Sequence, residues 1–191
     1  MSRPSDDEIT GWAFAARRGD RAALERFVRA TQHDVWRFVA HLTDNQLAED
    51  LAQETYARAL RGLARFEGRC SARAWLLSIA RRVAADHIRA VRVRPRQADV
   101  PDWQHAAEQS TPAGASRFEE YVALRALVGA LDPERHEAFV LTQTLGLSYA
   151  EAAEVCGCPV GTIRSRVARA REELVALVRQ DVGPGGPRLA M

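Results

Sequence analysis

Apolar residues recur along most of the chain at the three-to-four-residue spacing of an α-helix, and almost no segment alternates as a strand does. Short polar breaks that contain Gly, Asp or Asn separate these stretches and supply residues that favour helix starts. Four helices are predicted in the first half of the chain: Asp6–Arg18, Asp20 to about Leu42, Gln46–Leu63 and Ala72–Val93. The pattern therefore predicts an all-α fold.

The periodic pattern stops after Pro95, which ends the fourth predicted helix. The segment that follows is rich in Pro, Gln, Ser and Ala and has no apolar period, so it predicts a flexible linker. Helices resume after it, and Asp132 followed by Pro133 is a strong helix start. The predicted organisation is two small helical domains at 5–95 and 117–180, a linker at 96–116, and a disordered tail at 181–191.

The second predicted domain contains a helix-turn-helix at about Leu147–Arg171. Ser148 and Glu151 form a capping-box pattern that opens a short helix. Gly157 ends this helix after two turns, and Pro159 occupies the first turn of the next one. Two short helices joined by a tight turn that contains Gly are typical of this DNA-binding motif.

The second helix of this motif has two different faces at about 100° per residue. The face predicted to be buried carries Ile163, Val167, Ala170 and Leu174, with Val160 close to it. The opposite face and its flanks carry Thr162, Arg164, Ser165, Arg166, Ala168 and Arg169. A basic face alone is more often a solvated surface, but small residues with Arg also suit the major groove and the phosphates beside it. The capping box, the turn and the absence of acids together favour DNA.

Bulk composition narrows the class of protein. The 191 residues have a formal net charge of only +2, but 69–96 holds eight Arg and one acid, and 159–171 holds four Arg and none. Three Cys do not form a disulfide framework in a chain of this length. The first residues do not resemble a signal peptide, and no apolar run is long enough to span a bilayer. We expect a cytoplasmic protein with reduced thiols.

The third predicted helix also has two faces. Leu47, Leu51, Thr55, Ala59 and Leu63 form one face, and Asp50, Gln53, Glu54, Arg58 and Arg61 form the other. The polar face can be a solvated surface, which is the default for a surface helix. It can also dock a basic partner helix, because Asp50 and Glu54 place two acids one turn apart. The sequence leaves both interpretations open.

The fourth predicted helix and the loop before it interleave basic and aromatic residues. The set comprises Phe66, Arg69, Arg73, Trp75, Arg81, Arg82, His87 and Arg89. Such a mixture suits single-stranded DNA, because Arg steers the backbone and aromatic rings stack on bases. For Trp75 a place in the core is the alternative interpretation.

Two other functions are alternatives. A stand-alone repressor or activator would also use the helix-turn-helix but would not need acids on the third helix. An enzyme built as a di-metal helical bundle would need Glu-x-x-His repeats, and the chain has none. Cys156 and Cys158 lack the further ligands of a zinc site and are interpreted as small packing residues. We therefore expect no enzymatic activity, no metal and no cofactor.

Three segments resemble the extracytoplasmic-function (group 4) sigma factors of bacterial RNA polymerase. Ala48–Leu60 resembles their polymerase-binding helix, Ala74–Arg82 the start of their −10 helix, and Cys158–Glu172 their −35 recognition helix. The order of the three segments also matches, and the resemblance covers roughly 9–180. Within the family, Thr31–Val39 and Leu141–Ser148 are most similar to a mycobacterial member.

The resemblance implies a role for each segment. Asp50, Gln53, Glu54 and Arg58 would dock on the coiled-coil of the β′ clamp of core RNA polymerase. The loop Phe66–Ser71 would take up a flipped base of the −10 element, and Arg81 and Arg82 would hold the melting strand. Arg164, Ser165, Ala168 and Arg169 would meet the −35 duplex.

The resemblance further implies a contact with the β flap of the polymerase and allows control by an anti-sigma factor. The pair Arg69-Cys70 departs from the family pattern, so it implies no base preference.

Overall fold

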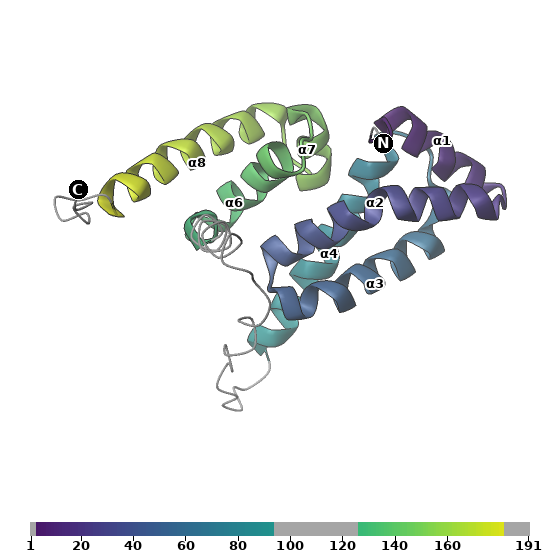
Figure 1. The fold of residues 1–191 in the computed structure, drawn as a ribbon, viewed down its shortest axis with the longest axis horizontal. Helices are drawn as coiled ribbons and strands as arrows, with labels where there is room; N and C mark the ends of the chain where they lie inside the picture. The colour runs from purple at the N-terminus through teal and green to yellow at the C-terminus, as the bar shows by residue number, and fades with distance from the viewer. Residues whose placement is uncertain (1–2, 94–125, 182–191) are drawn as a thin grey trace, which may run out of the picture.

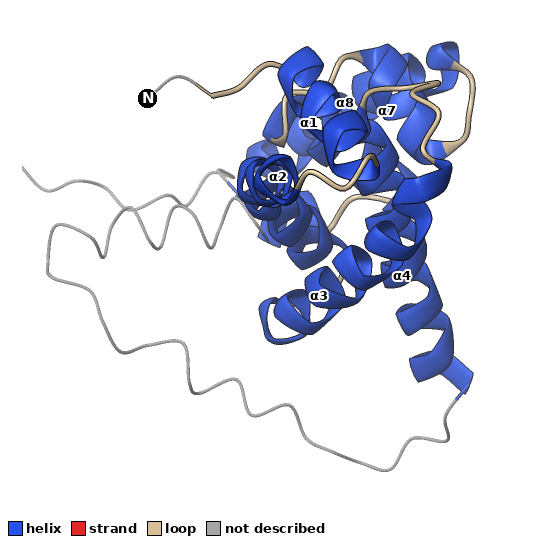
Figure 2. Cartoon of the chain, turned by 90° about the vertical axis from the view of Figure 1, so that its right-hand side faces the viewer, coloured by secondary structure: helices blue, strands red, loops and turns tan. Residues whose placement is uncertain are grey.

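The computed structural model describes residues 3–93 and 126–181, which contain helices and loops but no strand (Figure 2). The elements are α1 Asp6–Arg17, α2 Arg21–Leu42, α3 Asn45–Gly62, the 3-10 turn η1 Leu63–Arg65, α4 Ala72–Val93, α6 Pro133–Phe139, the π-helical turn η3 Val140–Thr144, α7 Tyr149–Cys156 and α8 Val160–Asp181. The predicted linker 96–116 and the tail beyond 181 lie outside these residues. None of the described helices is long and apolar enough to cross a membrane.

The predicted helix boundaries are confirmed by the caps. Ser148 and Glu151 form a complete capping box at α7, and Gly157 ends this helix with a left-handed φ of 65°. Asp20, Asp44 and Asp132 accept backbone N–H groups at the starts of α2, α3 and α6. The capping box of Ser5 and Glu8 at α1 follows the same sequence rule but was not predicted.

The first four helices form the N-terminal half of the molecule (Figure 1). The apolar stripe predicted on α4 is buried at Leu76, Ala80 and Val83, while Ile79 is half-buried. On α3, the predicted apolar face is buried at Leu51, Thr55 and Ala59, with Leu47 half-buried, and it continues to the buried Leu63 of η1. The predicted faces of α3 and α4 are therefore confirmed.

The C-terminal half consists of α6, η3, α7 and α8, and α8 extends beyond the rest of the molecule (Figure 1). Ile163, Val167 and Ala170 pack inward as predicted, and Leu174 is half-buried. Val160, which the sequence placed near this buried face, is instead 41% exposed. The turn between α7 and α8 thus presents the start of α8 to solvent.

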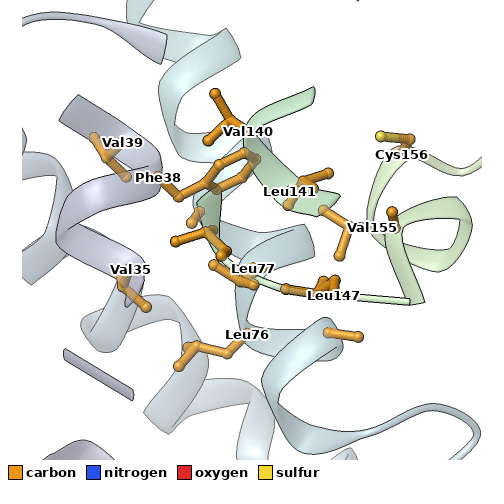
Figure 3. Close-up of a cluster of buried hydrophobic side chains, with 14 of the residues drawn as sticks. Val35, Phe38, Val39, Leu76, Leu77, Val140, Leu141, Leu147, Val155 and Cys156 are labelled. Atoms are coloured by element: carbon orange, nitrogen blue, oxygen red, sulfur yellow. The ribbon is translucent and has the colours of Figure 1, made fainter. Parts of the chain in front are cut away.

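The two halves share one hydrophobic core. Phe38 of α2 and Leu77 of α4 lie in the same cluster as Val140, Leu141 and Leu147 of the C-terminal half (Figure 3). The interface runs mainly between α4 and α7, with η3 against α2. The sequence analysis predicted two domains and did not foresee this packing. Its signal was a second apolar stripe on α4, formed by Ala74, Leu77 and Ala84, all buried.

Polar contacts accompany the apolar interface. Arg73 donates a hydrogen bond to the carbonyl of Leu145, and Arg81 pairs with the buried carboxylate of Glu137. Ser71 Oγ lies 3.1 Å from Glu151 Oε1 and donates to it. Arginines predicted to bind DNA thus help to hold the two halves of the chain together.

Candidate nucleic-acid and docking interfaces

The outward face of α8 is exposed and basic. Arg164, Ser165, Ala168 and Arg169 all lie on the surface, as predicted. Arg164 and Arg169 form no ion pair with any acid in 3–93 or 126–181. Their guanidinium groups are therefore available to an external anion such as a phosphate.

The other two residues predicted on this face are placed differently. The Arg166 side chain is only 18% exposed and pairs with Glu134 of α6. Its guanidinium also lies 3.7 Å from Cys158 Sγ, and Thr162 is half-buried beside Ser165. Arg166 therefore ties α8 to α6, which a spacing rule for α8 alone could not show.

The predicted −10 set on α4 divides by burial. Arg82 and Arg89 are exposed, and His87 is half-buried. Arg73 is only 4% exposed, and its Nε lies 2.7 Å from Asp34 Oδ2, so this guanidinium forms a buried ion pair within the protein. The structure thus corrects the prediction for Arg73, since a buried and paired side chain cannot reach DNA from this position.

The loop between η1 and α4 encloses a small cavity of about 290 Å³. Its lining consists of Arg65, Phe66, Glu67, Gly68, Arg69, Cys70 and Trp75. The rings of Phe66 and Trp75 lie 5.0 Å apart, and Phe66 is buried. Phe66 therefore lines the cavity as a buried ring, and the structure does not test its predicted contact with DNA. Trp75 is half-buried, so its exposure does not decide between a place in the core and stacking on a base.

The remaining loop residues differ in exposure. The Arg69 side chain is 86% exposed and lies 2.7 Å from Glu67. Ser71 caps α4 by accepting the Ala74 N–H at 3.2 Å. Burial raises the pKa of the Cys70 thiol, and the nearby carboxylates of Glu154 and Glu151 raise it further. Cys70 is therefore a neutral thiol at the edge of the cavity.

The predicted docking face of α3 lies on the surface. Asp50 and Gln53 are exposed, while Glu54 and Arg58 are half-buried. Arg58 contacts Glu54 at 2.7 Å and Asp86 of α4 at 2.8 Å. The hydrogen bonds from Arg58 lower the pKa of both carboxyls, so both stay ionised at neutral pH. The face therefore presents fixed negative charge at one end and an internal ion-pair network at the other.

A groove between α2 and α3 extends this face. It has a volume of about 420 Å³ and is lined by Val28, Gln32, His33, Trp36, Glu49, Ala52, Gln53 and Tyr56. The Trp36 side chain is a large apolar surface that is 37% exposed. The hydroxyl oxygens of Tyr56 and Thr31 lie 2.8 Å apart and share a hydrogen bond. Burial raises the pKa of Tyr56 to about 12. Trp36 was not predicted as a surface residue. Its position outside the apolar stripe of α2 was the feature of the sequence that indicated its exposure.

The comparisons with known proteins match both halves of the chain. Residues 27–94 match the family model described as Sigma-70 region 2, and residues 121–174 match Sigma-70, region 4. The chain is 53% identical over 178 residues to the ECF RNA polymerase sigma factor SigC of Mycobacterium tuberculosis, covering 93% of this chain and 95% of the relative.

The chain belongs to the extracytoplasmic-function sigma factors. It directs promoter recognition in the initiation of transcription, as the sequence analysis predicted, and its predicted similarity to a mycobacterial member is confirmed. The ECF RNA polymerase sigma-E factor of Escherichia coli is 32% identical over 186 residues, covering 91% of this chain and 95% of that relative. Sigma factors are regulators of the polymerase rather than catalysts.

Two solved structures have a similar arrangement. CnrH, in complex with the cytosolic domain of CnrY, has a TM-score of 0.70 at 26% identity, covering 93% of this chain and 99% of that one. The sigma factor RpoE of Bartonella quintana, in complex with the anti-sigma factor NepR, has a TM-score of 0.62 at 26% identity, covering 82% and 96%. Because the first likeness covers most of this chain, it extends across both halves.

Proposed function

We propose that this sigma factor divides promoter recognition between its two halves. The outward face of α8 would read the −35 duplex, the loop 66–71 and α4 would bind the −10 strand, and α3 would dock on core RNA polymerase. The observation that carries the proposal is the unpaired basic face of α8 on the same chain as the acidic face of α3. A stand-alone repressor needs the first face only.

The −35 contact follows from the geometry of α8. Ala168 and Ser165 are small and exposed, so the helix can approach the floor of a major groove. Arg164 and Arg169 flank them and reach further, to guanine edges or phosphates. Arg166 and Thr162 lie at the side of this face and would help to hold α8 in position.

The −10 contact follows from the loop and the exposed part of α4. The cavity bounded by Trp75 and Cys70 would receive one unstacked base, while Arg69, Arg82 and Arg89 would hold the strand by its phosphates. Arg81 would join them only after exchanging Glu137 for a phosphate, since its guanidinium is paired in this structure. Ser71 and His87, both half-buried, would be further polar contacts of this strand.

The polymerase contact would centre on Asp50, Gln53 and Glu54 of α3, which present acid and amide groups one turn apart. A basic coiled-coil surface, such as the resemblance assigns to the β′ clamp, would complement them. Trp36 would add apolar contact from the adjoining groove, as large aromatic side chains do at protein interfaces. The C-terminal half would meet the β flap.

A reconstitution experiment tests this proposal. The full chain with Asp50→Arg and Glu54→Arg should lose binding to core RNA polymerase and core-dependent transcription from promoters selected with the wild type. The matched control carries the same charge change at two exposed acids away from α3, Asp7→Arg with Glu25→Arg. Equal binding of both variants would refute the docking assignment. If wild-type protein gave no core-dependent transcription from any promoter, the whole proposal would fail.

An anti-sigma factor is a further partner that we propose, because the RpoE neighbour is held by one in a solved complex. The polymerase contact would place the protein in the cytoplasm. Co-purification of the tagged full chain with a second protein, and loss of transcription when that protein is added to the reconstituted system, would support it. Transcription unchanged by the added protein would count against it.

A further inference from the structure

Helix α1 presents three side chains to the segment that leads into α4. Thr10, Phe14 and Arg17 are spaced four and three residues apart, so they lie along one face of the helix. All three contact residues between 66 and 72, which lie far from α1 in the sequence. Helix α1 also lies outside the residues that match the region 2 family model, which begin at 27.

Two hydrogen bonds fix the ends of this segment. Arg17 Nη1 donates to the carbonyl oxygen of Phe66 at 2.8 Å, where the segment leaves η1. The N–H of Ala72, at the start of α4, donates to Thr10 Oγ1 at 3.0 Å. Both backbone groups would otherwise need water or another partner, because they lie at a turn and at a helix end.

Phe14 supports the segment between these two ends. Its ring centroid lies 5.2 Å from that of Phe66, which in turn packs on Trp75. Gly68 crosses directly over the Phe14 ring, and a Cβ at this position would lie 2.5 Å from Phe14 Cζ. Gly68 also has a φ of 73°, a conformation that disfavours other residues. The path of the loop is therefore determined by the ring beneath it.

We propose that α1 is a positioning element that sets the base preference of the −10 loop. The inference rests on the proposed function, in which the cavity bounded by Gly68, Cys70 and Trp75 takes up a −10 base. Discrimination between bases requires lining groups held within a fraction of an ångström. The three α1 side chains supply that rigidity, and they do so without touching the DNA themselves.

The first test uses full-length protein with core RNA polymerase and a promoter library randomised at the −10 element. The wild type is profiled first, and core-dependent transcription with a defined profile establishes the proposed function independently of α1. Arg17→Ala should then lower the ratio of transcription from preferred to non-preferred −10 sequences by about tenfold, the size expected for one lost charge-assisted hydrogen bond. The −35 preference should not change.

Two further variants separate positioning from general damage. Arg17→Lys keeps a donor and should restore part of the −10 preference, while Arg18→Ala removes a neighbouring exposed Arg and should leave the profile unchanged. A uniform loss of transcription over all −10 sequences with Arg17→Ala would overturn the proposal, as would an unchanged profile. Neither outcome contradicts the proposed function, because the wild-type profile establishes it separately.

A compensation experiment tests the contact between Phe14 and Gly68 directly. Gly68→Ala should alter the −10 profile because the new methyl group meets the Phe14 ring and because Ala is strained at this φ of 73°. Adding Phe14→Leu removes the Cζ atom and should move the profile back towards the wild type. Thermal unfolding of each variant confirms that the protein is folded. If the double variant is no closer to the wild-type profile than Gly68→Ala, the proposed contact does not position the loop.

Discussion

Two arginines of α4 and two of α8 lie in opposite electrostatic surroundings. On α4, Arg73 and Arg81 are paired with carboxylates that are themselves buried, Asp34 and Glu137. On α8, Arg164 and Arg169 are exposed and have no acidic partner in the described part of the chain. The same residue type thus serves the fold on one helix and faces solvent on the other.

This difference in ion pairing determines how each helix can bind DNA. An unpaired Arg on α8 loses only hydration and mobile counterions when a phosphate approaches, so binding is direct and depends on salt. Arg81 must first give up Glu137, and its binding is therefore an exchange between two anions. Counting basic residues in the sequence does not separate these cases, because the decisive carboxylates come from distant segments.

Removing the acid from a buried pair is expected to have the largest effect. Asp34→Ala leaves the buried Arg73 guanidinium without its closest carboxylate, with only the Leu145 carbonyl and the more distant Asp6 carboxylate as partners. It should lower the free energy of unfolding by about 3–5 kcal/mol. Denaturant unfolding measures this change. Glu25→Ala removes an exposed partner of Arg29 and should cost well under 1 kcal/mol. Similar losses for the two variants would mean that the α4 pair is not structurally distinct.

Alkylation of Cys156 reports on the packing of α7, which lies against α4. Burial raises the pKa of the Cys156 thiol to about 12 from its ordinary 9.0, with Glu137 also raising it and Arg81 lowering it. At about pH 8 the thiolate is therefore much rarer than in the unfolded chain. Iodoacetamide labelling followed by mass spectrometry should show a correspondingly slow reaction until urea is added. Fast labelling of the native protein would indicate that α7 is not packed as described.

Arg169→Ala tests the unpaired face. If Arg169 contacts one base, the change should cost about 1–3 kcal/mol at a single −35 base pair and relax the preference there. Core-dependent transcription from promoters varied across the −35 element measures it, with Arg179→Ala, exposed near the other end of α8, as the control. Uniform weakening over every sequence would identify Arg169 as a phosphate contact instead.

A smaller effect is expected at the carboxyl pair between α1 and α7. Burial raises the pKa of Asp6, and Glu151 raises it further, against the lowering effect of Arg73 and Arg3. The folded state therefore binds this proton more tightly than the unfolded state, and stability falls as pH rises above 3.8 through the folded pKa. Asp6→Asn removes this loss and should raise the unfolding midpoint slightly at pH 7.

The advantage of Asp6→Asn should shrink as the pH is lowered towards the ordinary aspartate value. Thermal unfolding over a pH series checks this behaviour. An advantage that grows on acidification would show that the pKa of Asp6 is lowered rather than raised in the folded protein.

Local rules predicted most of the fold. Caps such as Asp20 and Asp132, the turn at Gly157 and the stripes of α3 and α4 depend on neighbours within one or two turns, which the sequence displays directly. The exposure of Arg164 and Arg169 follows from the same helical spacing. These features needed no knowledge of the tertiary structure.

The long-range contacts could not be predicted, for a different physical reason. Arg73, Phe66 and Arg166 were predicted to bind DNA from their type and position, and in the structure each also contacts a residue far away in the chain. The packing of α4 against α7 is likewise a long-range contact, indicated only by the second stripe at Leu77 and Ala84. A periodicity in one helix shows that a face is apolar but does not identify what covers it.

The shared core between the halves has a thermodynamic consequence for polymerase binding. If the promoter complex requires α4 and α7 to part, the buried cluster around Phe38, Leu77 and Val140 must be opened first. Only the open fraction of molecules would then be competent, and the apparent dissociation constant would exceed the intrinsic one by the reciprocal of that fraction. Substitutions that weaken this cluster would accordingly tighten apparent binding while they lower stability, so the two quantities would change in opposite directions.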